Sequence, residues 1–398
     1  MPASLASDLR DSADHLQTAQ TIQIDILNGS VDIIDPLADE WRSLSRRAAN
    51  SEVSYRPEWL QTWLRAFEPT ATLTLLTARA DVRLVAVLPL IIRVRLVGGI
   101  PARLAVSPTN HHSCRFDLLY EDSPQGEAAI GRIWESLVRN PGWDCLQFSY
   151  APDGGALDEM TRLAHAAQFP VWRRQAWSNA YITTDQWDGT PDYWLKQTSP
   201  KFERNVRRLR RKCADESEIR LERVDSADPA ALEEFYGIES SGWKGERETG
   251  IKAHADTLRF YNQIAQQAAH FGYLSIYFLY LGEQLAAAQF GFRYNGKFIA
   301  AKCAFDEKFR SLSPGHLIVD SILQDCGGSK LRELELGGEF EEWKTKWTSL
   351  THNHSSLFIF RNSLYGRFLY HARARLVPAA GRLIRRLEQI GRKLPQRH

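Results

Sequence analysis

Apolar positions in the first half of the chain follow helical spacing and then strand-like runs. Residues 36–48 and 57–67 place apolar side chains three and four positions apart, and Pro57 suits the first turn of a helix. Short apolar runs bounded by Asp, Gly and Pro come next, which predicts strands of a mostly buried sheet. We predict strands at 22–27, 73–79, 84–93, 102–106, 116–120 and 145–150, and further helices at 128–138 and 156–168.

The second half repeats this order of elements. A strand-like stretch precedes two helical segments, three closely spaced strands, a helix and one more strand. Asn295-Gly296, between the last two of the three strands, is a strong hairpin signal. We therefore predict an α/β fold with a weak internal duplication. The predicted elements are strands at 219–225, 273–281, 284–294, 297–305 and 331–338, and helices at 229–243, 255–271 and 314–327.

Changes of pattern along the chain predict its organisation. The 398 residues are 43% hydrophobic and 25% charged, which is enough apolar sequence for two cores. A loose polar tail opens the chain, and a mainly helical connection with a basic helix joins the two α/β halves. The predicted boundaries are 1–20 for the tail, 21–184 for the first half, 185–218 for the connection, 219–361 for the second half and 362–398 for a basic helical tail.

Charge and cysteine content exclude several classes of protein. The 50 basic and 48 acidic residues give a formal charge of +2, so a dedicated nucleic-acid binder is not indicated. Five widely spaced cysteines without a C-x-x-C pair predict neither a disulfide framework nor a zinc ribbon. The polar, acidic start lacks the features of an export signal, and no window approaches the about 20 apolar residues of a spanning helix. We therefore expect a cytoplasmic protein.

The loop from Arg310 to Gly315 is the most specific local feature. It follows the predicted strand at 297–305 and ends where a helix begins. Helix N-termini present unpaired N–H groups and a partial positive charge, so such a loop suits a phosphate or pyrophosphate. Ser313 and Pro314 are also good residues for helix capping and a first turn, which is the alternative explanation for both.

This strand, R-x-x-S-x-G loop, helix and following strand resemble the acyl-CoA-binding core of the GNAT acetyltransferases. Arg310 and Gly315 match the usual R/Q-x-x-G-x-G/A loop, whereas Ser313 replaces its first glycine. The chain from about 22 to 361 more specifically resembles the cellulose-biosynthesis-associated (CelD/BcsL-type) group. That group is related to Fem-type peptidoglycan aminoacyltransferases with two GNAT-like halves. The pieces that carry the resemblance include PEWLQTWLRAF from Pro57, SPKFERNVRRLRRK from Ser199, SLSPGHLI from Ser311 and LGGEFEEWKTKWT from Leu336.

The resemblance implies tandem GNAT-like (Fem-type) halves with mixed, largely antiparallel sheets, flanking helices and a basic C-terminal helical tail. It also implies acetyl-CoA as the acyl donor, held on the C-terminal half, while the N-terminal half helps to hold the acceptor. The predicted cofactor-binding residues are Arg310, Ser313, Gly315 and His316.

Acyl transfer from a thioester needs a positioned nucleophile and a route for its proton. The acidic candidates are Glu239, Asp306, Glu335 and Glu339. Of these, Asp306 and Glu339 stand at predicted strand ends, and the family resemblance places the end of the helix that contains Glu239 near the acceptor. For Asp306 and Glu339 a solvated strand-end carboxylate is the favoured alternative, and for Glu239 a surface helix acid is as well supported as a catalytic role. No tyrosine follows Gly338 where many GNAT enzymes keep a proton donor, so the general acid stays unassigned. The predicted catalytic residues are Glu239, Asp306 and Glu339.

Two Trp-Lys pairs and one polar cluster are candidates for acceptor binding. An indole can stack on a sugar face while a lysine meets a phosphate or carboxylate, although core indoles with snorkelling lysines would look the same. Histidine and aspartate near a strand entry could hold an acceptor hydroxyl, although a turn histidine with a local hydrogen bond is the alternative. The predicted substrate-binding residues are His112, Asp117, Trp243, Lys244, Trp343 and Lys344.

No metal site is predicted. His352 and His354 would point the same way on a strand, but no third ligand lies within sequence reach.

Two basic segments complete the picture. The helix after Ser199 places Phe202, Val206 and Leu209 on one face and its arginines on the others. These arginines could bind the phosphates of CoA, a sugar nucleotide or a lipid, or they could simply be solvated. The stretch from Arg361 to His398 holds ten Arg or Lys residues and one acid, Glu388. It predicts a short amphipathic helix that could lie on an anionic membrane, dock on the protein or bind a phosphate effector.

The family resemblance implies N- or O-acetyl transfer to a sugar of an exopolysaccharide, a cell-surface polysaccharide or a lipid-linked precursor. Expected partners are a sugar, sugar-nucleotide or lipid-linked saccharide acceptor, with an anionic membrane surface and polysaccharide synthesis proteins as further candidates. One alternative is a Fem-type transferase that uses aminoacyl-tRNA, with the basic helix near Arg207 against RNA, which the near-neutral charge disfavours. The other is a non-catalytic GNAT-like module that binds a phosphate effector or a synthase partner.

Overall fold

The computed structural model describes residues 21–376, apart from 242–249 and the single positions Cys114, Pro141, Asp185, Gln186, Asp188, Pro191, Lys330 and Glu339. In the first half the strands are β1 (Ile22–Gly29), β2 (Leu73–Ala80), β3 (Arg83–Val97), β4 (Ile100–Val106), β5 (Leu119–Tyr120), β6 (Cys145–Pro152) and β7 (Val171–Thr183). The helices are η1 (Val31–Leu37), α2 (Ala38–Arg47), η2 (Val53–Tyr55), α3 (Pro57–Phe67), α4 (Pro124–Arg139) and α5 (Ala156–Ala166).

The second half follows the same plan. Its strands are β8 (Ile219–Val224), β9 (Leu274–Leu281), β10 (Gln284–Tyr294), β11 (Lys297–Phe305), β12 (Glu333–Glu335) and β13 (Thr351–Phe360). Its helices are α6 (Tyr193–Lys196), α7 (Pro200–Glu216), α8 (Pro229–Glu239), η3 (Ile251–Ala253), α10 (Ala255–His270), η4 (Glu307–Leu312), α11 (Pro314–Gly327), η5 (Lys344–Lys346), α12 (Leu364–His371) and η6 (Ala372–Leu376).

Local sequence accounts for many of these boundaries. Pro57 and Pro200 stand in the first turns of α3 and α7, and the Ser199 hydroxyl accepts a hydrogen bond from the Phe202 amide. Asn295 and Gly296 adopt positive φ of 48° and 73° between β10 and β11, as the hairpin dipeptide predicts. Among the described residues, no helix is long and apolar enough to cross a membrane.

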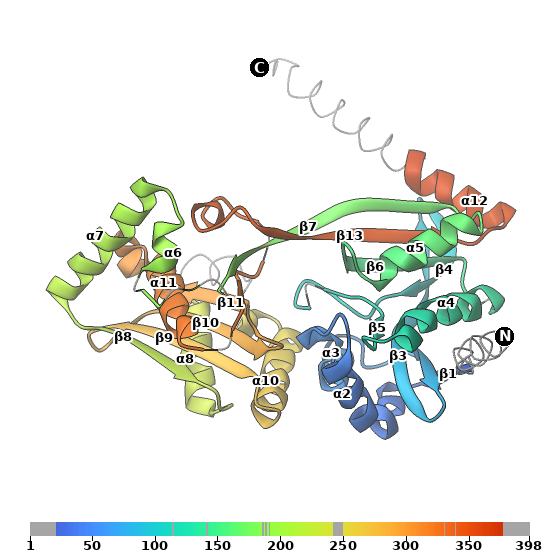
Figure 1. Ribbon diagram of the computed structural model, residues 1–398, viewed down its shortest axis with the longest axis horizontal. Coiled ribbons are helices and arrows are strands. Elements are labelled where there is room, and N and C mark those ends of the chain that lie inside the picture. The colour runs from blue at the N-terminus through green and yellow to red at the C-terminus, as the bar shows by residue number, and fades with distance from the viewer. Residues whose placement is uncertain are drawn as a thin grey trace, which may run out of the picture.

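The strands in the described part of the chain form one mixed sheet of 13 strands that runs through both lobes of the molecule (Figure 1). In each half, a strand and an antiparallel three-stranded meander precede a helix and a strand parallel to the last of the meander. The parallel pairs are β4 with β6 and β11 with β12. The predicted α/β fold with two tandem halves and a mixed, largely antiparallel sheet is thereby confirmed, and the two halves share a single sheet.

The last strand of each half lies in the sheet of the other half. β13 inserts between β6 and β7, and β7 in turn pairs with β12. Figure 1 shows β7 and β13 as long neighbouring strands that run from one lobe toward the other. Because backbone hydrogen bonds tie each half to the other, the interface between them is a fixed part of the fold. The residue boundaries predicted for the two halves stay predictions.

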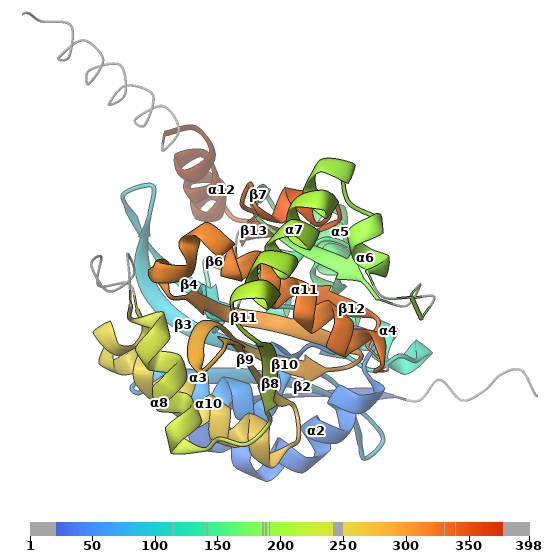
Figure 2. The same ribbon diagram turned by 90° about the vertical axis from the view of Figure 1, so that its left-hand side faces the viewer.

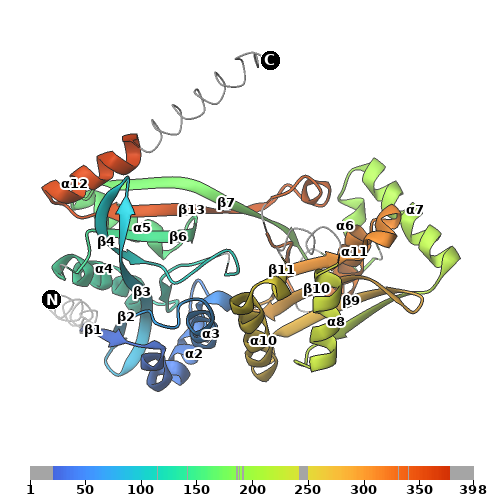
Figure 3. The same ribbon diagram turned by 180° about the vertical axis from the view of Figure 1, so that it is seen from behind.

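Helices cover both faces of the second half of the sheet, as the end view in Figure 2 shows. On one face α6, α7 and α11 pack with Tyr277, Leu279 and Phe298. On the other face α8 and α10 pack with Phe290 and Phe292, and this core continues into α2 and α3 of the first half. Figure 3 shows α3 and α10 side by side, where the rings of Trp59 and Phe260 meet edge to face at 5.4 Å.

β12 pairs with β11 over its whole length, and the segment that follows β12 separates from β11. The paired residues are Lys297–Ile299 and Glu333–Glu335. After them β11 continues to Phe305, whereas the segment that follows β12 turns at Gly337. Gly337 has a φ of 60°, and a Cβ there would lie 1.9 Å from the carbonyl oxygen of Ala300. Only glycine fits this close approach. We call the divergence the fork.

Candidate active site

The loop of residues 306–315, which the sequence predicts to hold a phosphate and which we call the phosphate loop, lies at the carboxyl end of β11. Asp306 caps η4 by accepting a hydrogen bond from the Lys308 amide, and Ser313 turns the chain with a φ of 50°. A Cβ on Gly315 would meet no atom within 4 Å, so the space beside this first turn of α11 is open. The Ser313 side chain makes no capping hydrogen bond to α11, so the capping predicted from the sequence is absent. Ser313 contributes its left-handed backbone conformation instead.

Arg310 reaches into solvent from this loop. Its side chain is 81% exposed and lies 3.6 Å from the Glu307 carboxylate in the preceding turn. Such a surface pair is weak, so the guanidinium can turn toward an anionic ligand at little cost. The predicted placement of Arg310 and Gly315 beside a helix start is therefore present in the structure.

His316 packs inward instead of lining the open side of the loop. Its Nδ1 accepts a hydrogen bond from the Trp347 indole at 3.0 Å, and its ring meets the edge of Phe202 at 5.0 Å. Burial, with a smaller effect from the charge of Lys346, lowers the pKa of His316 to about 4. The histidine is therefore neutral at pH 7 and anchors the segment around Trp343 and Trp347 to α11.

The second Trp-Lys pair lies beside the fork. The Lys344 side chain is buried, and its ammonium donates to the carbonyl oxygen of Gly337. The same ammonium lies 5.4 Å from the centre of the Trp343 ring, whose indole donates to Glu341. Lys344 therefore ties down the turn that follows β12. The first pair, Trp243 and Lys244, falls outside the described residues.

The three predicted catalytic carboxylates have different surroundings. Glu239 is buried at the end of α8 and accepts a hydrogen bond from the Ile251 amide at 2.8 Å. Burial acts to raise the pKa of Asp306, but the hydrogen bonds and charge of Lys308 outweigh it and leave the pKa below its ordinary value. Both groups thus hold local backbone turns. Glu339 lies outside the described residues.

The structure separates the predicted pair His112 and Asp117. His112 stacks on Phe67 with ring centres 5.3 Å apart, and its Nδ1 lies 3.3 Å from the Tyr261 hydroxyl. Burial first, and then the neighbouring His111, lowers the pKa of His112 to about 3. His112 is therefore a neutral component of the contact between α3 and α10.

Asp117 lies at the N-terminus of α5, where its carboxylate accepts hydrogen bonds from the amides of Ala156 and Leu157 and from the Asn50 side chain. Burial outweighs these hydrogen bonds and raises the pKa of Asp117 to about 6. Unlike His112, it lines a cavity.

A cavity of about 360 Å³ opens where the two halves meet, and we call it the seam cavity. Its volume falls within the range of small-molecule sites, and most of its lining residues are polar. The lining residues are Asn50, Glu52, Tyr55, Arg115, Asp117, Pro152, Asp153, Gly154, Gly155, Lys297, Thr351, His352 and Asn353.

Five charged side chains, which we call the seam network, lie in and behind the wall of this cavity. Arg115 contacts Glu52 and lies 3.2 Å from Glu335. The Lys297 ammonium lies 2.8 Å from Glu52, 3.5 Å from Glu335 and 3.7 Å from Glu333. Glu335 is among the acidic candidates of the sequence, but Glu52, Arg115, Lys297 and Glu333 were not predicted as site residues, because the network joins β11, β12 and two loops of the first half.

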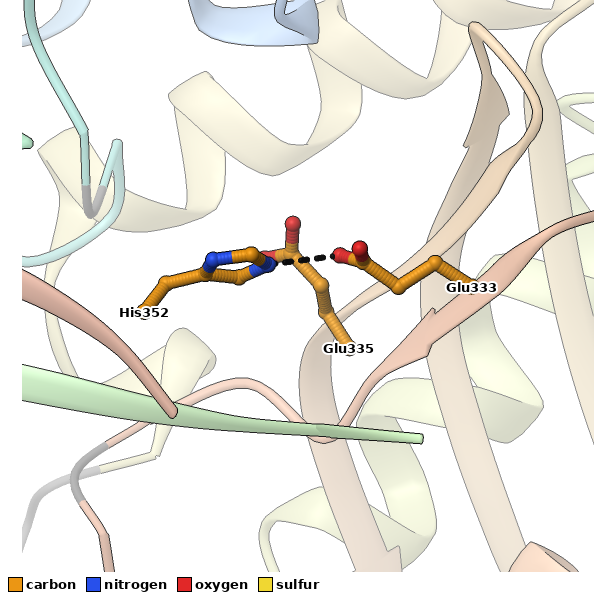
Figure 4. Close-up of side chains that lie close together, drawn as sticks. All are labelled: Glu333, Glu335 and His352. Carbon is orange, nitrogen blue, oxygen red and sulfur yellow. Dashed lines mark hydrogen bonds and ion pairs between the residues drawn. The ribbon is translucent and has the colours of Figure 1, made fainter. Parts of the chain in front are cut away.

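His352 and His354 extend the seam network from β13. The His352 ring stacks on Tyr181 at 4.0 Å and reaches across β7 to Glu333, with Nε2 and Oε1 2.9 Å apart (Figure 4). The fully buried His354 accepts a hydrogen bond from Arg115. Burial first, and then the charge of Arg115, lowers its pKa to about 3.

Ligand atoms of Glu333, Glu335 and His352 lie within 4.8 Å of one another, which is close enough to surround a metal ion. The side chains converge in Figure 4. Sheet pairing thus supplies the neighbours of His352 that sequence spacing alone did not show. Lys297 and Arg115 already pair with these carboxylates, so internal cations supply the positive charge that a metal would bring.

The basic helix α7 docks as predicted and also carries paired charges. Phe202, Val206 and Leu209 are buried on its inner face. On its flank, Arg210 bridges Asp192 and Asp320, and Arg207 lies 2.9 Å from Glu203. Part of the basic surface is therefore neutralised within the protein.

The second half of the chain matches a known domain family in sequence. Residues 200–345 match the model of an acetyltransferase (GNAT) domain. This range contains α7, the phosphate loop, α11 and the fork. No curated protein matches the chain in sequence at a significant level.

Solved structures extend the similarity of the fold beyond the GNAT domain to both halves. The chain superposes on FemX with a TM-score of 0.55 at 11% identity, covering 87% of this chain and 99% of FemX. A protein of unknown function from Bacteroides thetaiotaomicron gives 0.50 at 10% identity, with 85% and 100% covered. The C-terminal domain of a protein described as a putative lysylphosphatidylglycerol synthetase from Agrobacterium fabrum gives 0.50 at 11%, with 87% and 96% covered. These likenesses concern the fold.

Proposed function

We propose that this protein is an acetyl-CoA-dependent acetyltransferase that acts on a sugar of an exopolysaccharide, a cell-surface polysaccharide or its lipid-linked precursor. One observation carries the proposal: β11 joins the two candidate sites. The phosphate loop follows its carboxyl end at Phe305, and the seam cavity lies at its other end, at Lys297. A donor held by its phosphates at the loop would extend along β11 toward the fork, and the acceptor would reach its thioester from the side of the seam cavity.

The reaction needs few specialised groups. An acceptor nitrogen or oxygen attacks the thioester carbon, the new C–N or C–O bond forms, the C–S bond breaks and the acceptor proton is released. Positioning the nucleophile beside the thioester supplies much of the rate. The CelD/BcsL resemblance supports the choice of a polysaccharide sugar, and the GNAT match over 200–345 supports acetyl-CoA as the donor.

Calorimetric titration with acetyl-CoA, followed by mass analysis of products from amino sugars and lipid-linked saccharides, tests this function. We expect acetyl-CoA to bind and one acceptor class to gain a single acetyl group. Binding without transfer to any acceptor would favour a regulatory module. Transfer that depends on added aminoacyl-tRNA would favour a Fem-type reaction, which the fold shared with FemX keeps as the second candidate.

We further propose that residues 362–398 attach the protein to the inner face of an anionic membrane. In α12, the described start of this segment, Leu364 is 90% exposed, and Tyr365 and Phe368 are also exposed. Apolar side chains among arginines suit an interfacial helix. The chain truncated after Asn362 should lose sedimentation with anionic vesicles, and the full chain should lose it in 1 M salt. Equal sedimentation of both chains would exclude this segment as the anchor.

A further inference from the structure

The hairpin of β3 and β4 extends beyond the neighbouring strands of the sheet. β2 pairs with β3 only as far as Ile91, and β6 pairs with β4 only from Leu104 onward. Residues 92–103 therefore continue as a two-stranded ribbon in which β3 and β4 pair with each other, and we call this ribbon the outer hairpin. Figure 2 shows it in cyan, projecting from the sheet beside α12.

The inner face of the outer hairpin is fixed to the protein. Val97 and Ala102 are buried in a small core together with Leu369 of α12. The Tyr365 hydroxyl, also from α12, donates a hydrogen bond to the carbonyl oxygen of Pro101. Side-chain packing and a hydrogen bond thus join the outer hairpin to α12, and Figure 3 shows the two together at one end of the molecule.

The outer face exposes a row of apolar side chains. Ile92, Val94 and Leu96 alternate along β3 and so share one face, where they are 37%, 72% and 68% exposed. In the described part of the chain, five large apolar side chains are more than half exposed. Four of them lie on the outer hairpin and α12, namely Val94, Leu96, Leu364 and Phe368. Single exposed apolar residues are ordinary, whereas such a cluster marks an interaction surface.

The charge around this cluster selects the partner. Neither residues 83–106 nor residues 361–376 include an Asp or a Glu. Arg95 and Arg367 are exposed, and the Arg103 side chain is 52% exposed although it lies 3.2 Å from Asp144. Apolar side chains among arginines fit the interface of an anionic bilayer, which takes up the apolar groups and attracts the cations. A second copy of the chain would bring an identical basic face, and the like charges would repel.

We propose that the outer hairpin is a second membrane contact, which inserts Val94 and Leu96 into the interface of an anionic bilayer beside α12. The inference rests on the membrane attachment proposed above for residues 362–398 and deepens it. Because the outer hairpin is a fixed part of the sheet, two contacts at one end of the molecule determine which end faces the bilayer. A tail alone would leave the orientation of the protein free.

Sedimentation of the full chain with vesicles of equimolar phosphatidylglycerol and phosphatidylcholine tests the proposal. Leu96→Asp replaces an inserted apolar side chain by an anion, so we expect the partition coefficient onto these vesicles to fall at least tenfold. Leu96→Thr, which suits a strand and adds no charge, should lower it about threefold. Thermal unfolding should match the wild type in both variants, because the side chain is largely exposed.

The matched control is Val82→Asp. Val82 is 87% exposed in the turn between β2 and β3, at the opposite end of β3, and this substitution makes the same change of charge. It should leave the partition coefficient within about twofold of the wild type, since this end faces away from the bilayer. Unchanged binding of Leu96→Asp, or equal losses in Leu96→Asp and Val82→Asp, would overturn the proposal.

The chain truncated after Asn362 separates this inference from the attachment by the C-terminal segment. If the truncated chain loses binding and full-length Leu96→Asp binds like the wild type, the outer hairpin fails and the C-terminal attachment stands. If Leu96→Asp loses binding and the truncated chain keeps it, the C-terminal attachment fails and the outer hairpin stands.

Sedimentation velocity without vesicles tests the other occupant of this face. We expect the wild type and Leu96→Asp to have the same oligomeric state. A wild-type dimer that becomes a monomer in Leu96→Asp would assign the face to a second copy of the chain and overturn the membrane contact.

Discussion

The phosphate loop and the seam network lie at opposite ends of β11 and are built in different ways. The loop comes from one continuous stretch of ten residues, and its key side chain, Arg310, is largely exposed. The seam network brings together residues from 52 to 335, and Arg115 and Glu335 in it are buried. A local loop can bind through backbone geometry with little cost to stability, whereas a buried charge network couples function to the integrity of the fold.

The largest expected effect concerns Arg115. Arg115→Ala leaves Glu52 and Glu335 with less compensation, so we expect a loss of about 3–5 kcal/mol in the free energy of unfolding, measured with denaturant. The matched control in the loop, Arg310→Ala, should change stability by less than about 0.5 kcal/mol. Similar losses of stability in both variants would show that the loop and the seam network do not differ in their contribution to the stability of the fold.

The substitution Lys344→Met tests whether Lys344 stabilises the fork or contacts the acceptor. It removes the hydrogen bond to the Gly337 carbonyl while keeping most of the packing of the stem, so we expect a loss of about 1.5–3 kcal/mol in stability. The exposed Lys346→Met serves as the control. A raised KM for the acceptor with unchanged stability would instead support the acceptor contact predicted from the sequence.

The substitution Arg310→Glu tests the role of the phosphate loop in donor binding. Charge reversal should weaken acetyl-CoA binding at least tenfold, which is about 1.4 kcal/mol, because the side chain would then repel the phosphates. Titration calorimetry measures the affinity, and thermal unfolding should match the wild type. Unchanged affinity would mean that the donor phosphates bind elsewhere.

The pH dependence of stability is expected to report on two buried histidines, His316 beside the phosphate loop and His354 beside the seam network. The pKa values of His316 and His354, about 4 and about 3, lie below the 6.5 of an unfolded histidine. The unfolded chain therefore binds these protons first, and stability falls as the pH drops below about 6.5. Asp117 and Asp320, with pKa values raised to about 6, act in the opposite direction, so stability rises as they become protonated.

The measurement is the free energy of unfolding from pH 6 to pH 5, taken for the wild type and for His316→Asn and His354→Asn. Each substitution should reduce the pH slope by at most about 1.4 kcal/mol per pH unit. A slope unchanged in either variant would show that its histidine is protonated in the folded protein.

Much of the fold followed from local signals. The spacing of apolar residues predicted the repeated order of elements, and Asn295-Gly296 and Ser199 marked a turn and a helix start that the structure contains. The exchange of β7 and β13 between the halves was not predicted, because hydrogen bonding between distant strands leaves no local pattern in the sequence.

The sequence by itself determined the α/β fold, the repeated order of elements and the loop between β11 and α11, since turns, caps and hydrophobic periodicity act over a few neighbouring residues. Only the tertiary structure decided which polar residues meet. It separated His112 from Asp117, turned His316 inward and gathered Tyr55, Arg115 and Lys297 around one cavity. The physical reason is that burial and ion pairing depend on contacts between residues far apart in the chain, and these exist only once the sheet has formed.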